Sequence, residues 1–102
     1  MGGSAESESD ARLIRRSLSD AVAFAEIFDR HYAAVHRFLA TRWGKETGAD
    51  LASETFLIAF DRRGQFDPSK PSARPWLFGI ALNLSRMEAR KRSRESTAVE
   101  RG

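Results

Sequence analysis

Apolar side chains recur along this chain with the period of an α-helix. Phe24, Phe28, Tyr32, Val35 and Leu39 are spaced by 4, 4, 3 and 4 residues, which places them on one face of a helix. No segment alternates apolar and polar residues as a half-buried strand would. A length of 102 residues fits one domain. The sequence therefore predicts an all-α fold, a compact bundle of three main helices plus a short leading helix.

Capping residues and glycines predict where the first helices begin and end. The short leading helix is expected to start at Ser9 or Asp10. The striped helix is expected from about Asp20, a candidate N-cap, to Trp43, with Gly44 as its stop.

The second half of the chain predicts two more helices. One is expected from the capping-box pattern of residues 47–50 (TGAD) to about Arg62, before Gly64. Residues 65–71 contain two X-Pro pairs and are expected to form a loop. Ser72 is the expected cap of the last helix, which is predicted over residues 73–92 with Pro75 in its first turn. Its predicted core stripe contains Trp76, Leu77, Ile80, Leu84 and Met87.

Neither composition nor motifs support an enzyme. The chain has no cysteine, which excludes disulfides, thiolate metal sites and cysteine nucleophiles. His31 and His36 are five residues apart rather than the four of a helical metal pair, and both are expected at the surface or boundary of their helix. No glycine-rich phosphate loop and no converging catalytic constellation are present. We therefore expect no catalytic residue, no metal, no cofactor and no small-molecule substrate.

Charge is distributed unevenly along the chain. The formal net charge is +3, but residues 1–61 sum to −3 and residues 62–102 to +6. Five basic residues lie between Arg86 and Arg94. Such a block favours a polyanion, with nucleic acid first among the candidates, although cations also complement the carboxyl end of a helix. In the third helix, acidic residues indicate either a solvated face or a contact with a partner protein.

One edge of the last predicted helix carries groups suited to nucleic acid. With Trp76 at 0°, Asn83, Arg90 and Arg86 fall at about −20°, −40° and −80°. An asparagine amide matches a base edge, and an indole stacks on an unpaired base or inserts between base steps. A core tryptophan and an asparagine bonded to a neighbouring helix are the structural alternatives.

Three segments resemble the second domain of sigma-70 family factors of the extracytoplasmic-function group. They are residues 24–32 (FAEIFDRHY), residues 50–57 (DLASETFL), similar to a D-L-x-Q-E-x-F-L motif, and residues 74–83 (RPWLFGIALN) with 90–94 (RKRSR), similar to W-L-x-x-I-A-x-N and its terminal basic cluster. Ser53 stands where the family usually has glutamine, and Leu82 where a basic residue is common.

The resemblance implies a domain that docks on RNA polymerase core and recognises and melts the promoter minus-ten element. Docking on the β′ clamp helices would involve Asp50, Leu51, Ser53, Glu54 and Leu57. The non-template strand, with one flipped base, would be held by the loop before the last helix and by that helix. The implied DNA-binding residues are Phe66, Lys70, Arg74, Trp76, Asn83, Arg86, Arg90, Lys91 and Arg94.

The resemblance also sets expectations for the organisation of the chain. Residues 1–9 are small, polar and acidic, which by itself predicts a disordered tail, native or left from cloning, and residues 95–102 are expected to fray. The resemblance implies that residues 10–94 are the domain and that the frayed end starts a linker. A domain reading the minus-thirty-five element would follow in a longer protein. The protein would be cytoplasmic, with no membrane insertion, and an anti-sigma factor would be a partner. Two alternatives stay open: a helical interaction module bound by an anti-sigma regulator, and a generic basic nucleic-acid binder.

Overall fold

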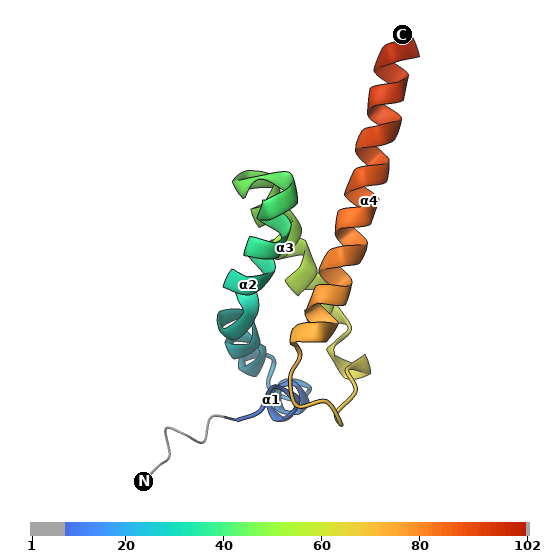
Figure 1. The fold of residues 1–102 in the computed structure, drawn as a ribbon. Coiled ribbons are helices and arrows are strands. Elements are labelled where there is room, and N and C mark those ends of the chain that lie inside the picture. Colours follow the sequence, from blue (N-terminus) through green and yellow to red (C-terminus); the bar gives the residue numbers. More distant parts are fainter. Residues whose placement is uncertain (1–7, 102) are drawn as a thin grey trace.

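The protein is an all-α bundle with no strand among the residues that the structure describes. The computed structural model describes the backbone of residues 8–101 and the side chains of residues 8–97, so the predicted tail at residues 1–9 lies almost wholly outside it. Figure 1 shows α2 and α3 side by side, α4 running along α3 and beyond the bundle, and α1 across the lower end. The elements, in chain order, are α1 (Asp10–Ser17), η2 (Ala21–Phe24), α2 (Ala25–Trp43), α3 (Lys45–Asp61), η3 (Arg63–Gln65) and α4 (Arg74–Arg101).

The core forms where the four α-helices meet. Leu13 of α1, Ile27 and Leu39 of α2 and Leu77 of α4 are buried to 1% exposure or less. The predicted stripe on α2 is confirmed in its second half. In its first half Phe24 is buried as predicted, while Ile27 and His31 are buried in place of their neighbours Phe28 and Tyr32. Phe28 lies at the edge of α2, where it packs on α3.

Two predicted helix starts are wrong. Asp20 precedes a 3₁₀ turn, η2, and its side chain makes no capping hydrogen bond. The predicted capping box lies inside α3, which begins at Lys45 directly after Gly44. Gly44 has a φ of 87°, a conformation that glycine adopts at no steric cost. One residue therefore ends α2, as predicted, and turns the chain into α3 without a side-chain cap.

The last helix is longer than predicted, and its core stripe matches the predicted one at Leu77 and Leu84 but not at Met87. α4 continues to Arg101, through residues predicted to fray, because no glycine or proline interrupts residues 80–101. Its buried line runs through Leu77, Ala81 and Leu84, whereas Met87 is 50% exposed. Large side chains predict a stripe that includes Trp76, but the small Ala81 is fully buried and extends the buried line beyond Leu77.

The helix starts at α1 and α4 agree with the predictions. The Ser9 hydroxyl accepts a hydrogen bond from the Arg12 N–H at 3.2 Å. The Ser72 hydroxyl accepts one from the Arg74 N–H at 3.1 Å. None of the helices in the described part of the chain has the length and apolar character needed to cross a bilayer.

Candidate nucleic-acid interface

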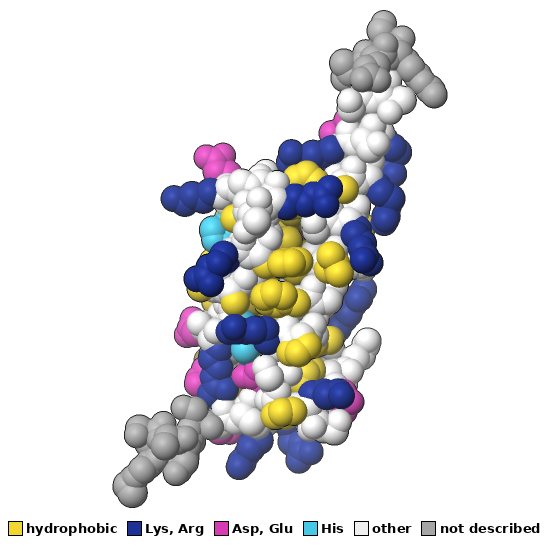
Figure 2. Space-filling view, in the orientation of Figure 1, with side chains coloured by type: hydrophobic (Ala, Val, Ile, Leu, Met, Phe, Trp, Pro, Cys, Tyr) yellow, Lys and Arg dark blue, Asp and Glu magenta, His cyan; other side chains and the backbone are white. Residues whose placement is uncertain are grey.

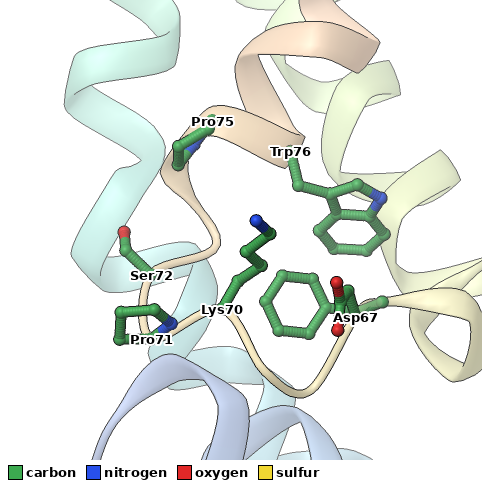
Figure 3. Close-up of a pocket in the computed structure, with 7 residues that line it drawn as sticks. Asp67, Lys70, Pro71, Ser72, Pro75 and Trp76 are labelled. Carbon is green, nitrogen blue, oxygen red and sulfur yellow. The ribbon is translucent and has the colours of Figure 1, made fainter.

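A pocket of about 530 Å³ opens at the start of α4 (Figure 3). The loop between η3 and α4 forms one side of it and the first turn of α4 the other. The rings of Phe66 and Trp76 lie 5.2 Å apart at an angle of 59°, and Phe66 is buried from solvent. The Trp76 ring is partly exposed beside the open volume, and such an aromatic face is suited to stacking an unpaired base. The lining residues are Phe66, Asp67, Lys70, Pro71, Ser72, Pro75 and Trp76.

The loop that forms this pocket is held by its own hydrogen bonds. The Asp67 carboxylate accepts from the Ser69 N–H at 2.9 Å and from the Ser69 hydroxyl at 2.8 Å. These two bonds hold the pKa of Asp67 below its usual value, with a smaller contribution from the charge of Lys70. The Lys70 N–H donates to the Asp67 carbonyl at 3.1 Å. The tight turn presents the exposed Lys70 side chain at the pocket.

A second groove, of about 540 Å³, continues along α4 from Trp76 to Met87. Asn83 and Arg86 line it and are exposed. Within the described residues, the Asn83 amide makes no hydrogen bond to a neighbouring helix, which removes the structural alternative for this side chain. Its donors and acceptor face a groove that begins at the same indole as the pocket.

The basic end of α4 forms a third groove with α3. Arg90, Lys91 and Arg94 line it together with Leu51 and Glu54 of α3. These three cations and Arg86 are exposed, and none forms an ion pair with another described side chain. The residues predicted for DNA and for polymerase therefore meet along one groove.

Arg92 differs from the other basic residues at this end of α4. Its guanidinium donates to Glu88 at 2.7 Å and lies 4.9 Å from the centre of the Trp43 ring. The Trp43 indole N–H donates to Ser85 at 2.9 Å. Arg92 thus connects α4 to the turn between α2 and α3.

The predicted polymerase-binding residues on α3 form one exposed face, except for Leu51. Asp50, Ser53, Glu54 and Leu57 are exposed and fall within about 100° of the helix circumference. Leu57 is 70% exposed and lies among the carboxylates of this face. Leu51 is 7% exposed and packs in the core.

A buried polar cluster, absent from the sequence predictions, holds the start of α4 in place. Asp10 Oδ2 accepts from the Ala73 N–H and is 2.7 Å from His31 Nε2. Asp10 Oδ1 accepts from Arg30 at 3.0 Å. Arg74 Nε donates to His31 Nδ1 at 3.2 Å, so the partners assign the ring proton to Nε2.

The buried cluster changes two predictions, the exposure of His31 and the contacts of Arg74. His31 was expected near the surface but is 6% exposed. Burial alone would raise the pKa of Asp10, but hydrogen bonds from Ala73, His31 and Arg30 outweigh burial and lower that pKa. Arg74, predicted to contact DNA, is exposed but directs its guanidinium onto His31 and the Arg30 carbonyl. No pattern in the sequence indicates that Asp10 contacts His31 and Ala73, which lie 21 and 63 positions further along the chain.

Comparison with known proteins gives one family and one curated relative. Residues 27–95 match the family described as Sigma-70 region 2. The chain is 39% identical over 71 residues to the "ECF RNA polymerase sigma factor BldN" of Streptomyces coelicolor. That alignment covers 69% of this chain and 27% of the relative. No solved structure matches the chain.

Proposed function

The chain belongs to the sigma-70 region 2 family, in the extracytoplasmic-function group, and on that premise we propose that it acts in transcription initiation by holding the non-template strand of a melted minus-ten element. The observation that carries this proposal is the Phe66–Trp76 pocket continuing into the groove of Asn83 and Arg86. A base that leaves the duplex enters the pocket and stacks on aromatic rings. Its neighbours lie along α4, where an amide reads a base edge and arginines neutralise phosphates.

Binding energy alone is sufficient for this role. Stacking one base on an aromatic side chain contributes about 1–3 kcal/mol, and a good bidentate contact to a base edge discriminates by a similar amount. Stacking requires an unpaired base, whereas a base edge is also accessible in the grooves of a duplex. The domain therefore favours the melted state by binding it better than the duplex, and no catalytic group is required.

We further propose that the exposed face of α3 docks on RNA polymerase core through the β′ clamp helices. A leucine that is 70% exposed is an apolar anchor, and Asp50 and Glu54 beside it favour a basic partner surface. Ser53 is also exposed on this face, but its side chain is shorter than the glutamine usual in the family.

Selection of bound sequences tests the base-reading part of the proposal. A pool of single-stranded DNA with a randomised ten-nucleotide window is bound to the protein, recovered and sequenced. We expect a preferred sequence, and we expect Asn83→Ala to lose preference at one position while affinity for the pool changes little. Arg86→Ala should lower affinity for all sequences and reduce the salt dependence. Binding without preference in the unaltered protein would contradict base reading and leave a generic basic binder.

Capture of purified core RNA polymerase tests the docking face. Glu54→Arg reverses one charge on this face and should reduce capture by tenfold or more, since like charges across an interface cost several kcal/mol. Asp29→Arg places the same reversal on the exposed surface of α2 and should capture polymerase normally. Equal capture by both variants would argue against this face.

A second role as the target of an anti-sigma regulator is favoured by apolar side chains beside the DNA groove. Leu82 and Met87 are 39% and 50% exposed and line the same groove as Asn83. A regulator that covers them would also cover the nucleic-acid surface, so DNA and regulator should compete for the chain. Simultaneous binding of both would separate the two surfaces.

A further inference from the structure

Arg74 differs from the other cations predicted to bind DNA, because its charged group is held by the protein itself. Its Nε donates to His31 Nδ1 at 3.2 Å, and one terminal nitrogen donates to the Arg30 carbonyl at 3.4 Å. Lys70 and Arg86, in contrast, line the pocket and the groove of α4. Arg74 is nevertheless exposed and lies in the first turn of α4. The group that accepts from Arg74 therefore decides whether this guanidinium is available to a bound strand.

The acceptor, His31, is a buried ring with both nitrogens engaged. Its side chain is 7% exposed. Nε2 lies 2.7 Å from Asp10 Oδ2 and donates to it, while Nδ1 accepts from Arg74. A neutral imidazole has one donor nitrogen and one acceptor nitrogen, so these two bonds match the neutral ring. The bond to Arg74 exists only while Nδ1 carries no proton.

Charged groups surround His31 from three helices. Asp10 comes from α1, Arg30 from α2 itself and Arg74 from α4. Arg30 is paired with Asp10 at 3.0 Å and with Glu26 at 2.8 Å. Within the part of the chain that the structure describes, no charged side chain of α3 or of the loop before α4 joins these bonds. Figure 2 shows dark blue, magenta and cyan side chains next to one another on the face between α2 and α4.

Protonation of His31 would break one of its two bonds and keep the other. Histidine is the side chain whose charge ordinarily changes between about pH 5 and 8. The added proton makes Nδ1 a donor, so it no longer accepts from Arg74, and the imidazolium repels the guanidinium. The Asp10 carboxylate still accepts from Nε2 and balances the new charge. Because Arg74 is exposed, its guanidinium can then leave α2 and reach a backbone phosphate.

We propose that His31 is a positioning residue for Arg74, whose guanidinium the neutral ring holds against α2 and the protonated ring releases to a backbone phosphate of the bound strand. This inference rests on the proposed function. It predicts that the affinity for single-stranded DNA rises as pH falls, through one additional phosphate contact. Such a contact increases affinity without adding sequence preference.

The salt dependence of single-strand binding at two pH values tests this inference. A rhodamine-labelled strand carries the sequence recovered by selection, and anisotropy gives Kd between about 50 and 200 mM KCl, at about pH 8 and about pH 5.5. One phosphate contact to a single strand contributes about 0.7 to the logarithmic salt slope. The slope should therefore be steeper by about 0.7 at the lower pH, where the protein should lose about 2.6-fold more affinity across this salt range than at the higher pH.

Three variants separate the release of Arg74 from other effects of pH. His31→Gln keeps one donor and one acceptor but does not titrate, so its slope should be the same at both pH values. Arg74→Ala removes the released guanidinium while His31 still gains its proton, and its slope should also be independent of pH. His36→Gln removes the other histidine, whose Nε2 lies 3.1 Å from the Lys45 carbonyl, and should behave as the unaltered protein does. Circular dichroism verifies folding, and Arg74→Ala, which alters an exposed side chain, carries the test even where His31→Gln does not fold.

Nitrogen-15 NMR of the side chains gives a readout that requires no DNA. At about pH 8 the His31 ring should carry its proton on Nε2, and the Arg74 Nε–H should be protected from exchange with water by its hydrogen bond. At about pH 5.5 both ring nitrogens should be protonated and this protection should be lost. A ring that carries its proton on Nδ1 at the higher pH, or stays neutral at the lower pH, would overturn the inference.

The salt slopes across the variants decide the outcome. A slope for the unaltered protein that is equal at both pH values, or shallower at the lower pH, would overturn the inference and leave the proposed function standing. The same steepening in His31→Gln or Arg74→Ala would also overturn it, because the effect would then come from another group. Failure of the unaltered protein to bind any single strand at either pH would overturn the proposed function together with this inference.

Discussion

Replacement of Asp10 by alanine should destabilise the protein strongly, although the residue lies at the first position of a short helix. The carboxylate accepts hydrogen bonds from two groups that have little access to water. Ala73 is 0% exposed, and the His31 side chain is 7% exposed. Each buried donor left without a partner costs about 1–3 kcal/mol, so Asp10→Ala should cost roughly 3–4 kcal/mol. Arg30, at 23% exposure, keeps Glu26 as a partner and adds little.

Urea unfolding at pH 7, followed by the fluorescence of Trp43 and Trp76, measures this free energy. Domains of this size unfold with about 5–15 kcal/mol, so the predicted loss is a large share of the total. Asp29→Ala removes an exposed carboxylate from α2 and should change stability by no more than about 0.5 kcal/mol. A loss below about 1 kcal/mol for Asp10→Ala would refute the view that the buried cluster holds α1 and the start of α4 together.

Three further predictions concern stability. Hydrogen bonds lower the pKa of Asp10 in the folded protein. The charged carboxylate therefore stabilises the fold at pH values above its unfolded pKa of about 3.9, and this stabilisation is lost as pH falls through the lower pKa of the folded state. The difference in unfolding free energy between the unaltered protein and Asp10→Asn, measured in urea, should be constant above about pH 5 and shrink below about pH 4. Gly48→Ala would place a Cβ 2.7 Å from the α2 backbone and should lower the free energy of unfolding by about 1–3 kcal/mol. The Cβ of Gly79→Ala would meet nothing within 4 Å, so this variant should raise the free energy of unfolding by up to about 1 kcal/mol. Thermal or urea unfolding measures both changes. Arg92→Ala should lower the free energy of unfolding by about 0.5–1 kcal/mol, because it removes the contact with Trp43, and it should leave the affinity for DNA nearly unchanged. A lower DNA affinity with unchanged stability would instead assign Arg92 to the DNA surface.

Local patterns in the sequence predicted the helices because each depends on neighbouring residues. The apolar spacing from Phe24 to Leu39 and the stop at Gly44 are properties of one segment. The capping box at residues 47–50 failed because Gly44 turns the chain directly into α3. Gly48, which resembled part of a cap, is instead the point where α3 packs against Ala40 of α2. Only the packing of two helices discloses that role.

The candidate site was predictable in its composition but not in its geometry. Trp76 and Asn83 were singled out because helical spacing brings them to one edge of α4, and both line the same groove. The pocket beside Trp76 requires a loop whose path depends on a turn at Asp67. The cluster of Asp10 and His31 joins residues 21 positions apart, and no periodic pattern encodes such a pair.

The affinity of the protein for one selected sequence as a single strand and as a duplex tests the central claim most directly. Stacking in the pocket is available to an unpaired base and contributes about 1–3 kcal/mol, so the single strand should bind about 5-fold to 150-fold more tightly at equal salt. Trp76→Phe should keep part of this difference, and Trp76→Ala should abolish most of it. Equal or tighter binding of the duplex by the unaltered protein would contradict the account that this domain recognises the melted strand.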